Sequence, residues 1–180
     1  MRQVTSITQP STSIAISRLH SSPIGPLWVA VTSQGLARVE WDLAQSDFSE
    51  MIQADFRSPA VYDTSRTSQA IQQLSEYLDG SRFVFTLPID LYSRTDFQRQ
   101  VLQLTAQIPY GRTATYKDLA LRIGKPQAAR AVGRVEATNP LPLVIPCHRV
   151  LGSDGSLHGY GGPGDIKLKA WLLELEHSAI

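Results

Sequence analysis

The sequence predicts an α/β unit over residues 13–93, followed by a mainly helical unit over residues 94–180. Runs that alternate apolar and polar residues, as strands do, lie in the first unit. Runs with helical spacing follow one another in the second unit. A sharp glycine-containing turn separates two of those helical runs, which predicts a helix-turn-helix. Residues 1–12, rich in Ser and Thr, are expected to form a flexible tail.

The first unit should begin with an antiparallel meander of three short strands, in the runs SIAISRLHSS, PLWVAVTS and GLARVEW. Residues 22–26 and 33–35 separate these runs with turn-forming Pro, Gly and Ser. A helix is expected over residues 66–79, with Gly80 as its stop signal. Residues 83–87 should form a further strand, and no residue of this unit suggests catalysis.

The second unit should begin with three helices, and each has a recognisable start. Thr95 and Thr115 are residues of the type that caps helix N-termini. Pro126 follows a Gly-Lys turn and opens the third helix, which should run from Gln127 to about Ala137. The second and third of these helices would make the helix-turn-helix.

The third helix combines small residues with two arginines. Arg130 and Arg134 are four residues apart, so they share a helix face and repel each other unless an anion lies against them. Small residues beside them would let DNA approach closely, but tight packing against another helix explains them equally well. These small residues are Ala128, Ala129, Ala131 and Gly133.

Basic charge is concentrated in residues 94–150, although the net charge of the whole chain is only +1. The acidic residues of this segment are Asp96, Asp118 and Glu136. Its basic residues are Arg94, Arg99, Arg112, Lys117, Arg122, Lys125, Arg130, Arg134 and Arg149. Such a concentration favours a polyanionic partner, most commonly nucleic acid. A solvated helical surface is the alternative.

Cys147 is the only cysteine, which excludes an internal disulfide and a cysteine-rich zinc site. We expect neither a metal nor a cofactor. A lone thiol suits a reducing compartment. The chain has neither the apolar run of a membrane-spanning helix nor that of a signal peptide. These features together predict a cytoplasmic protein.

Cys147 stands in the run NPLPLVIPCHRV, directly before His148 and Arg149. A thiolate is a nucleophile, and either neighbour is a candidate for lowering the pKa of the thiol. Glu176, in the C-terminal amphipathic helix, could orient the histidine as a third group. A buried core cysteine and an exposed helix-end carboxylate are the alternatives. From these residues and the glycine-rich stretch 152–164, a cysteine hydrolase fits as well as a DNA enzyme.

The runs RAVG, NP, IPCHRV, GYGG and WLLELE together resemble the O6-alkylguanine-DNA alkyltransferase family. The resemblance is strong over residues 94–180 and weaker in SPIGPLWVAV and GLARVEW of the first unit. It implies a ribonuclease-H-like N-terminal domain and a helical C-terminal domain whose helix-turn-helix enters the minor groove. The damaged guanine would be flipped out of the duplex into a pocket.

The resemblance also implies a role for each motif residue. Cys147 would accept the alkyl group and His148 would act through a water molecule as its base. Glu176 would orient the histidine, and Asn139 would brace the active-site turn. Tyr116 would hydrogen-bond the flipped guanine. The alkylated cysteine has no activated leaving group, so the protein would be consumed in one turnover.

The implied partner is double-stranded DNA that carries O6-alkylguanine, with O4-alkylthymine as a second candidate substrate. Arg130 would fill the gap left in the duplex, and the protein would act as a monomer that can cluster on DNA. Further DNA contacts are implied for Thr115, Ala129, Ala131, Gly133 and Arg134. The base pocket is implied for Val150, Tyr160, Gly161 and Gly162.

Two departures from the family pattern bear on DNA binding. Gly161 stands where many relatives have serine, so a side-chain contact to the guanine O6 is absent there. Val135, Glu136 and Ala137 replace smaller, more neutral residues, and Glu136 would weaken DNA binding unless it points away or pairs with Arg134.

Two other functions remain open. One is a non-catalytic sensor of alkylated DNA, although the related sensors lack the cysteine. The other is a helix-turn-helix regulator.

Overall fold

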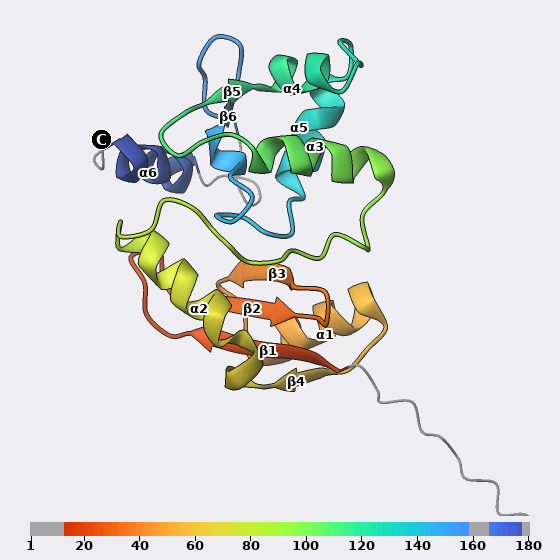
Figure 1. Ribbon diagram of the computed structural model, residues 1–180, viewed down its shortest axis with the longest axis vertical. Helices are drawn as coiled ribbons and strands as arrows, with labels where there is room; N and C mark the ends of the chain where they lie inside the picture. Colours follow the sequence, from red (N-terminus) through yellow and green to blue (C-terminus); the bar gives the residue numbers. More distant parts are fainter. Residues whose placement is uncertain (1–12, 159–165, 178–180) are drawn as a thin grey trace, which may run out of the picture.

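The computed structural model describes residues 13–158 and 166–177, so the predicted tail at 1–12 lies outside the described residues. A sheet with two helices forms the N-terminal half, and a group of helices forms the C-terminal half above it (Figure 1). Among the described residues, no helix is long and apolar enough to span a bilayer.

The predicted meander is confirmed. β1 (Ile14–Leu19), β2 (Leu27–Val31) and β3 (Leu36–Trp41) pair antiparallel in sequence order. A fourth strand that the sequence did not predict, β4 (Ala60–Tyr62), runs parallel to β1 and gives the order β3-β2-β1-β4. The unpredicted helix α1 (Gln45–Phe56) connects β3 to β4.

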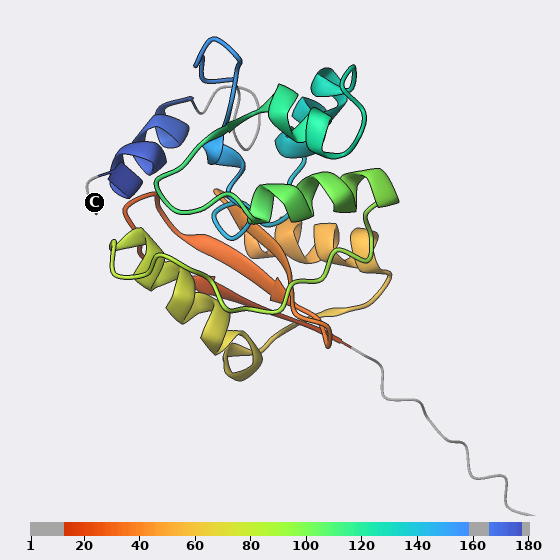
Figure 2. The same ribbon diagram turned by 45° about the horizontal axis from the view of Figure 1, so that its top comes forward.

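Both faces of the sheet are buried, because successive side chains of a strand point to opposite sides. Trp28 and Ala30 of β2 face α1 and pack with its residues Phe48 and Ile52. Leu27 and Val29 belong instead to the main core, which α2 (Thr64–Leu78) shares with the C-terminal half. Figure 2 shows α1 and α2 on opposite sides of the sheet.

The expected helix at 66–79 is α2, which begins two residues earlier because the Asp63 side chain caps it. The expected strand at 83–87 is wrong. Within the part of the chain that the structure describes, this segment forms no strand, and Gln73 of α2 bonds both the backbone N–H and the hydroxyl of Thr86 instead. An isolated bridge between Leu36 and Ile89 lies just beyond it.

The four predicted helices of the C-terminal half are present, three of them in succession. α3 (Asp96–Ala106) and α4 (Tyr116–Arg122) begin with capping boxes at Thr95 and Thr115. α5 (Ala129–Ala137) begins two residues later than expected. Gly124 ends the turn after α4 with a φ of 70°, a left-handed conformation that glycine adopts without strain.

Three short elements complete this half. β5 (Ala114–Thr115) pairs parallel with β6 (Val150–Leu151), which ties the start of α4 to the segment after the cysteine. A 3-10 turn, η1 (Cys147–Arg149), precedes β6. α6 (Ile166–His177) lies above the end of α2 in both views (Figures 1 and 2).

Candidate active site

Cys147 lies in a turn that Asn139 holds in place. The Asn139 amide nitrogen donates to the Ile145 carbonyl at 2.8 Å and contacts the Cys147 Sγ at 3.1 Å. Its side-chain oxygen accepts from the Leu141 backbone N–H at 3.0 Å. Leu143, between these contacts, has a φ of 73°, which a non-glycine residue rarely adopts. The asparagine therefore both closes the turn and touches the sulfur.

Cys147 is buried, with only 4% of its surface exposed. Burial, followed by the negative charge of Glu136, raises the pKa of this thiol to about 12, against the Asn139 hydrogen bond and the charge of Lys169. The groups that lower the pKa of the thiol are thus Asn139 and Lys169. The sequence had suggested His148 and Arg149 for this role. At neutral pH the thiol keeps its proton, so a nucleophilic Cys147 needs a base.

His148 has the geometry of a base, because Glu176 fixes its tautomer. The imidazole Nε2 lies 2.8 Å from the Glu176 Oε1, and both side chains are fully buried. Because a carboxylate oxygen only accepts, Nε2 carries the hydrogen and Nδ1 carries the lone pair that can take up a proton. Burial lowers the pKa of His148, which keeps the ring neutral at pH 7.

Glu176 is the centre of a larger buried cluster. Arg149 contacts both of its carboxylate oxygens, at 2.7–3.0 Å, and the backbone N–H of Gly111 donates to Oε2 at 3.1 Å. Burial opposes the charge, but the hydrogen bonds and charges of His148 and Arg149 outweigh it and lower the pKa of Glu176 to about 2. Arg149 also donates to the Ile108 carbonyl. It therefore holds Glu176 and does not activate Cys147.

The N-terminal half contributes Tyr77 to this cluster. Its hydroxyl donates to the Glu176 Oε1 at 2.7 Å and lies 3.2 Å from the His148 Nε2. The sequence suggested no catalytic residue in residues 13–93, and it did not indicate that Tyr77 contacts this cluster. A tyrosine on the buried face of a predicted helix was the available signal, because a buried hydroxyl needs a hydrogen-bond partner.

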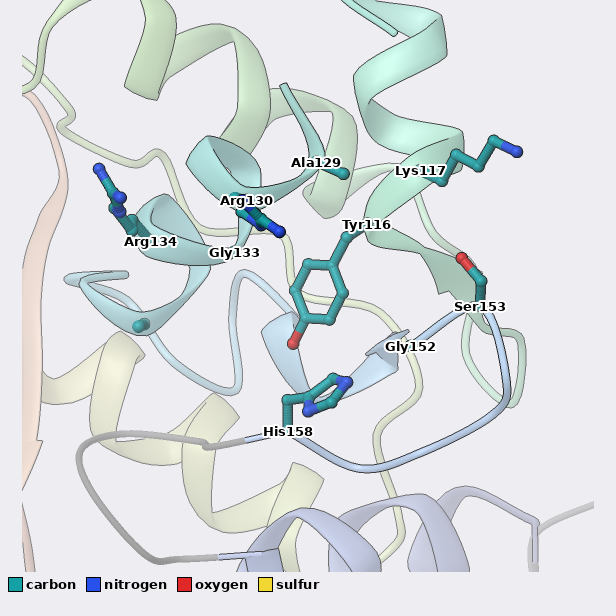
Figure 3. Close-up of a pocket in the computed structure, with 10 residues that line it drawn as sticks. Tyr116, Lys117, Ala129, Arg130, Gly133, Arg134, Gly152, Ser153 and His158 are labelled. Carbon is teal, nitrogen blue, oxygen red and sulfur yellow. The ribbon is translucent and has the colours of Figure 1, made fainter. Parts of the chain in front are cut away.

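A surface pocket of about 850 Å³ opens between the helix-turn-helix and the loop after β6 (Figure 3). Tyr116 lies in its centre, with the His158 ring beside the tyrosine hydroxyl. Burial, followed by the charges of Glu136 and Cys147, raises the pKa of Tyr116 to about 12, so its hydroxyl is a donor at neutral pH. The lining residues are Tyr116, Lys117, Ala129, Arg130, Gly133, Arg134, Ala137, Gly152, Ser153 and His158.

Not all residues implied for DNA contact line this pocket. Ala131 lies outside it, and the Thr115 hydroxyl is engaged in the α4 capping box with Asp118. Val150 is fully buried, with its carbonyl bound to Lys169. Tyr160, Gly161 and Gly162 lie outside the described residues.

Glu136 points inward, away from the exposed arginines. Its Oε1 accepts from the Thr105 hydroxyl at 2.6 Å, and the residue is only 5% exposed. It therefore neither lies at the helix surface nor pairs with Arg134, and the expected loss of DNA affinity has no basis in this residue. The sequence suggested Glu136 only as a residue that bears on DNA binding, and it gave no indication that Lys169 is buried, with 1% of its surface exposed.

The fold and the site define a protein with a lone buried cysteine, a buried His-Glu pair and a pocket on a helix-turn-helix. Two family patterns match the chain. The pattern "6-O-methylguanine DNA methyltransferase, ribonuclease-like domain" matches residues 16–91, and the pattern "6-O-methylguanine DNA methyltransferase, DNA binding domain" matches residues 96–178. The chain belongs to the family of methylated-DNA–protein-cysteine methyltransferases.

Individual relatives agree with this assignment. The methylated-DNA–protein-cysteine methyltransferase of Methanosarcina barkeri is 40% identical over 87% of this chain and 94% of the relative. The constitutive enzyme of Bacillus subtilis is 37% identical over 86% of this chain and 91% of its own length. A crystal structure of Mycobacterium tuberculosis OGT in complex with DNA superimposes with a TM-score of 0.77 and 38% identity, over 92% of this chain and 94% of that one.

Proposed function

We propose that this protein repairs DNA by moving an alkyl group from O6 of guanine irreversibly to the Sγ of Cys147. One observation carries the proposal: Asn139 holds the chain's only thiol, and the next residue along the chain, His148, is paired with the buried Glu176. The family to which the chain belongs is named for the same reaction.

The chemistry follows from the protonation states of the site. His148 takes the thiol proton through a water molecule, and Glu176 stabilises the resulting imidazolium. The sulfur then attacks the alkyl carbon, an S–C bond forms, and the bond from that carbon to O6 breaks with its electrons going to guanine. Tyr116 donates a hydrogen bond to the leaving guanine. The thioether at Cys147 has no activated leaving group, so each molecule reacts once.

The pocket gives this reaction access to DNA. Arg130, Arg134 and Lys117 place positive charge around its mouth, where the phosphates of a duplex would lie. A base inside a duplex is reached only after it is flipped out of the stack, and the pocket can receive it. We further propose a cytoplasmic monomer that can cluster on DNA, with a domain boundary at residues 93–94.

The decisive experiment uses duplex DNA with an isotopically labelled methyl group on guanine O6. We expect one label per protein molecule, located by peptide mapping on the fragment that contains Cys147. Label that stays on DNA to which the protein binds would identify a sensor of alkylated bases. Equal binding to unmodified duplex of one defined sequence would point to a regulator.

Replacing Arg130 with alanine should slow repair of duplex DNA on the order of tenfold and leave the reaction with free O6-methylguanine unchanged. The reason is that an extruded base leaves a gap, and an inserted side chain offsets the unstacking cost of a few kcal/mol. Single-turnover rates with the two substrates measure the difference. Arg122→Ala, also exposed but outside the pocket, is the matched control. Equal slowing with both substrates would contradict insertion by Arg130.

A further inference from the structure

The buried pair of His148 and Glu176 has a partner from the other half of the molecule, Tyr77, to which the proposed reaction gives no role. Tyr77 is the second-last residue of α2, whose end lies beneath α6 (Figures 1 and 2). It is fully buried, and its ring packs 5.2 Å from the ring of Phe85 and edge-on at 6.2 Å from that of Tyr110. A ring fixed in the main core therefore carries the hydroxyl to the pair.

The direction of each hydrogen bond at this hydroxyl follows from the hydrogens available. The Tyr77 hydroxyl has one hydrogen and lies 2.7 Å from the Glu176 Oε1, which can only accept. Burial, followed by the charge of Glu176, raises the pKa of Tyr77, so the hydroxyl keeps this hydrogen. The His148 Nε2 also donates to Oε1, at 2.8 Å. In the contact of 3.2 Å between Nε2 and the tyrosine oxygen, the imidazole is therefore the donor.

The tyrosine oxygen is a needed second acceptor because the first one is heavily used. Arg149 donates to the same Glu176 Oε1 from Nε at 3.0 Å and from Nη2 at 2.7 Å. A carboxylate oxygen has about two lone-pair sites, yet Arg149, His148 and Tyr77 all donate to this one. The Tyr77 Oη, the Glu176 Oε1 and the His148 Nε2 form a triangle with sides of 2.7, 2.8 and 3.2 Å. The imidazole N–H is thus held between two oxygens, which restrains rotation of the ring.

We propose that Tyr77 is a positioning residue for the base: from the N-terminal half, its hydroxyl holds the His148 ring in the orientation that takes up the proton of Cys147. The inference rests on the proposed function, in which His148 is that base. Tyr77 does not line the pocket on the helix-turn-helix, so it acts through the histidine and not on the substrate. Without the hydroxyl, the imidazole N–H keeps only an acceptor that Arg149 shares, and the ring turns more freely.

Replacing Tyr77 with phenylalanine removes the hydroxyl and keeps the ring that packs in the core. A general base contributes roughly 10²–10⁴-fold to a rate, and the variant keeps the base with one of its two acceptors, so we expect transfer about tenfold slower. The slowing should be the same with O6-methylguanine duplex and with free O6-methylguanine, and the affinity for duplex should not change. Single-turnover rates at pH 7 and fluorescence anisotropy measure these quantities.

A double-mutant cycle shows whether Tyr77 acts through the histidine. His148→Gln keeps a side-chain N–H that can donate to Glu176 but has no nitrogen that takes up a proton. In this background Tyr77→Phe should change the transfer rate by less than about twofold, because the base that it positions is already lost. A general loosening of the site would instead slow both backgrounds alike. Equal slowing in the two backgrounds, or a wild-type rate in Tyr77→Phe alone, would overturn the inference.

Iodoacetamide repeats the cycle without DNA or guanine. An S–C bond forms at Cys147 as the C–I bond breaks and iodide leaves, and the thiol proton again goes to His148. Cys147→Ser is the blank. A cycle in which Tyr77→Phe slows only the protein with His148, in a chain that accepts no label from DNA, would support the inference and refute the proposed function. Label on Cys147 together with equal slowing in both backgrounds would refute the role of Tyr77 alone.

Tyr110→Phe is the matched control, because it removes a second hydroxyl from the same group of aromatic rings. The Tyr110 hydroxyl donates to the Leu175 carbonyl of α6 at 3.3 Å. This variant should therefore react at the wild-type rate with iodoacetamide and with DNA, and urea unfolding should show that both tyrosine variants are folded. If Tyr110→Phe slowed the reaction as much as Tyr77→Phe does, the packing of α6 and not the bond to the pair would explain the effect, and the inference would be overturned.

Discussion

Replacing Cys147 with serine should abolish alkyl transfer completely while the affinity for duplex DNA stays within about twofold of the wild type. An alcohol is a far weaker acid than a thiol, so the buried His148 cannot generate the anion that attacks the alkyl carbon. The expected result is no label on the protein, even after prolonged incubation with excess O6-methylguanine duplex. Fluorescence anisotropy with the same duplex measures the affinity.

The serine variant should also fold normally. Its hydroxyl oxygen accepts the hydrogen bond that the Asn139 amide gives to the sulfur, and the side chain is smaller than that of cysteine. Chemical denaturation checks the fold independently of DNA. Loss of both transfer and DNA binding would assign Cys147 a structural role, and residual stoichiometric labelling would show that another residue is the acceptor.

The parts of the fold that the sequence predicted are those encoded by local signals. Thr95 and Thr115 were expected to cap helices, and both do so through contacts within three residues. Turn residues delimited the three-strand meander in the same way. Such contacts depend on sequence neighbours alone, so a single chain reveals them.

The parts that were missed depend on partners far along the chain. α1 buries only Phe48 and Ile52, which leaves too weak an apolar stripe for its helical spacing to be recognised. Residues 83–87 have the composition of a strand, but α2 satisfies their backbone through Gln73. In both segments the packing against another element decides the structure.

In the candidate site, too, the residues close together in sequence were predicted and those brought in from distant segments were not. Cys147, His148 and Asn139 belong to one continuous motif, and the resemblance to a family placed them together. Tyr77 reaches Glu176 across 99 positions of sequence. Lys169 is spaced like an ordinary lysine of an amphipathic helix, and only the fold buries it beside the nucleophile. A single sequence can mark Tyr77 as a buried hydroxyl that needs a partner, but it does not show which distant residue that partner is.

Replacing Glu176 with alanine should destabilise the protein by about 3–5 kcal/mol. The change leaves the Arg149 guanidinium buried without its carboxylate and removes the acceptor of the Tyr77 and His148 hydrogen bonds. Urea unfolding at pH 7 measures the loss, and Glu174→Ala, on the exposed side of the same helix, is the matched control. A loss below about 1 kcal/mol would mean that water replaces the carboxylate.

The dependence of the free energy of unfolding on pH tests the charge of Glu176 while the side chain keeps its size. The pKa of Glu176 is lowered from 4.5 to about 2 in the folded protein, so its contribution is fully present above pH 4.5 and is lost as the pH falls toward 2. A shift of this size corresponds to about 3 kcal/mol. The free energy of unfolding of the wild type should therefore fall toward that of Glu176→Gln between about pH 5 and 3. A constant difference between the two curves would contradict a charged Glu176 at the centre of the cluster.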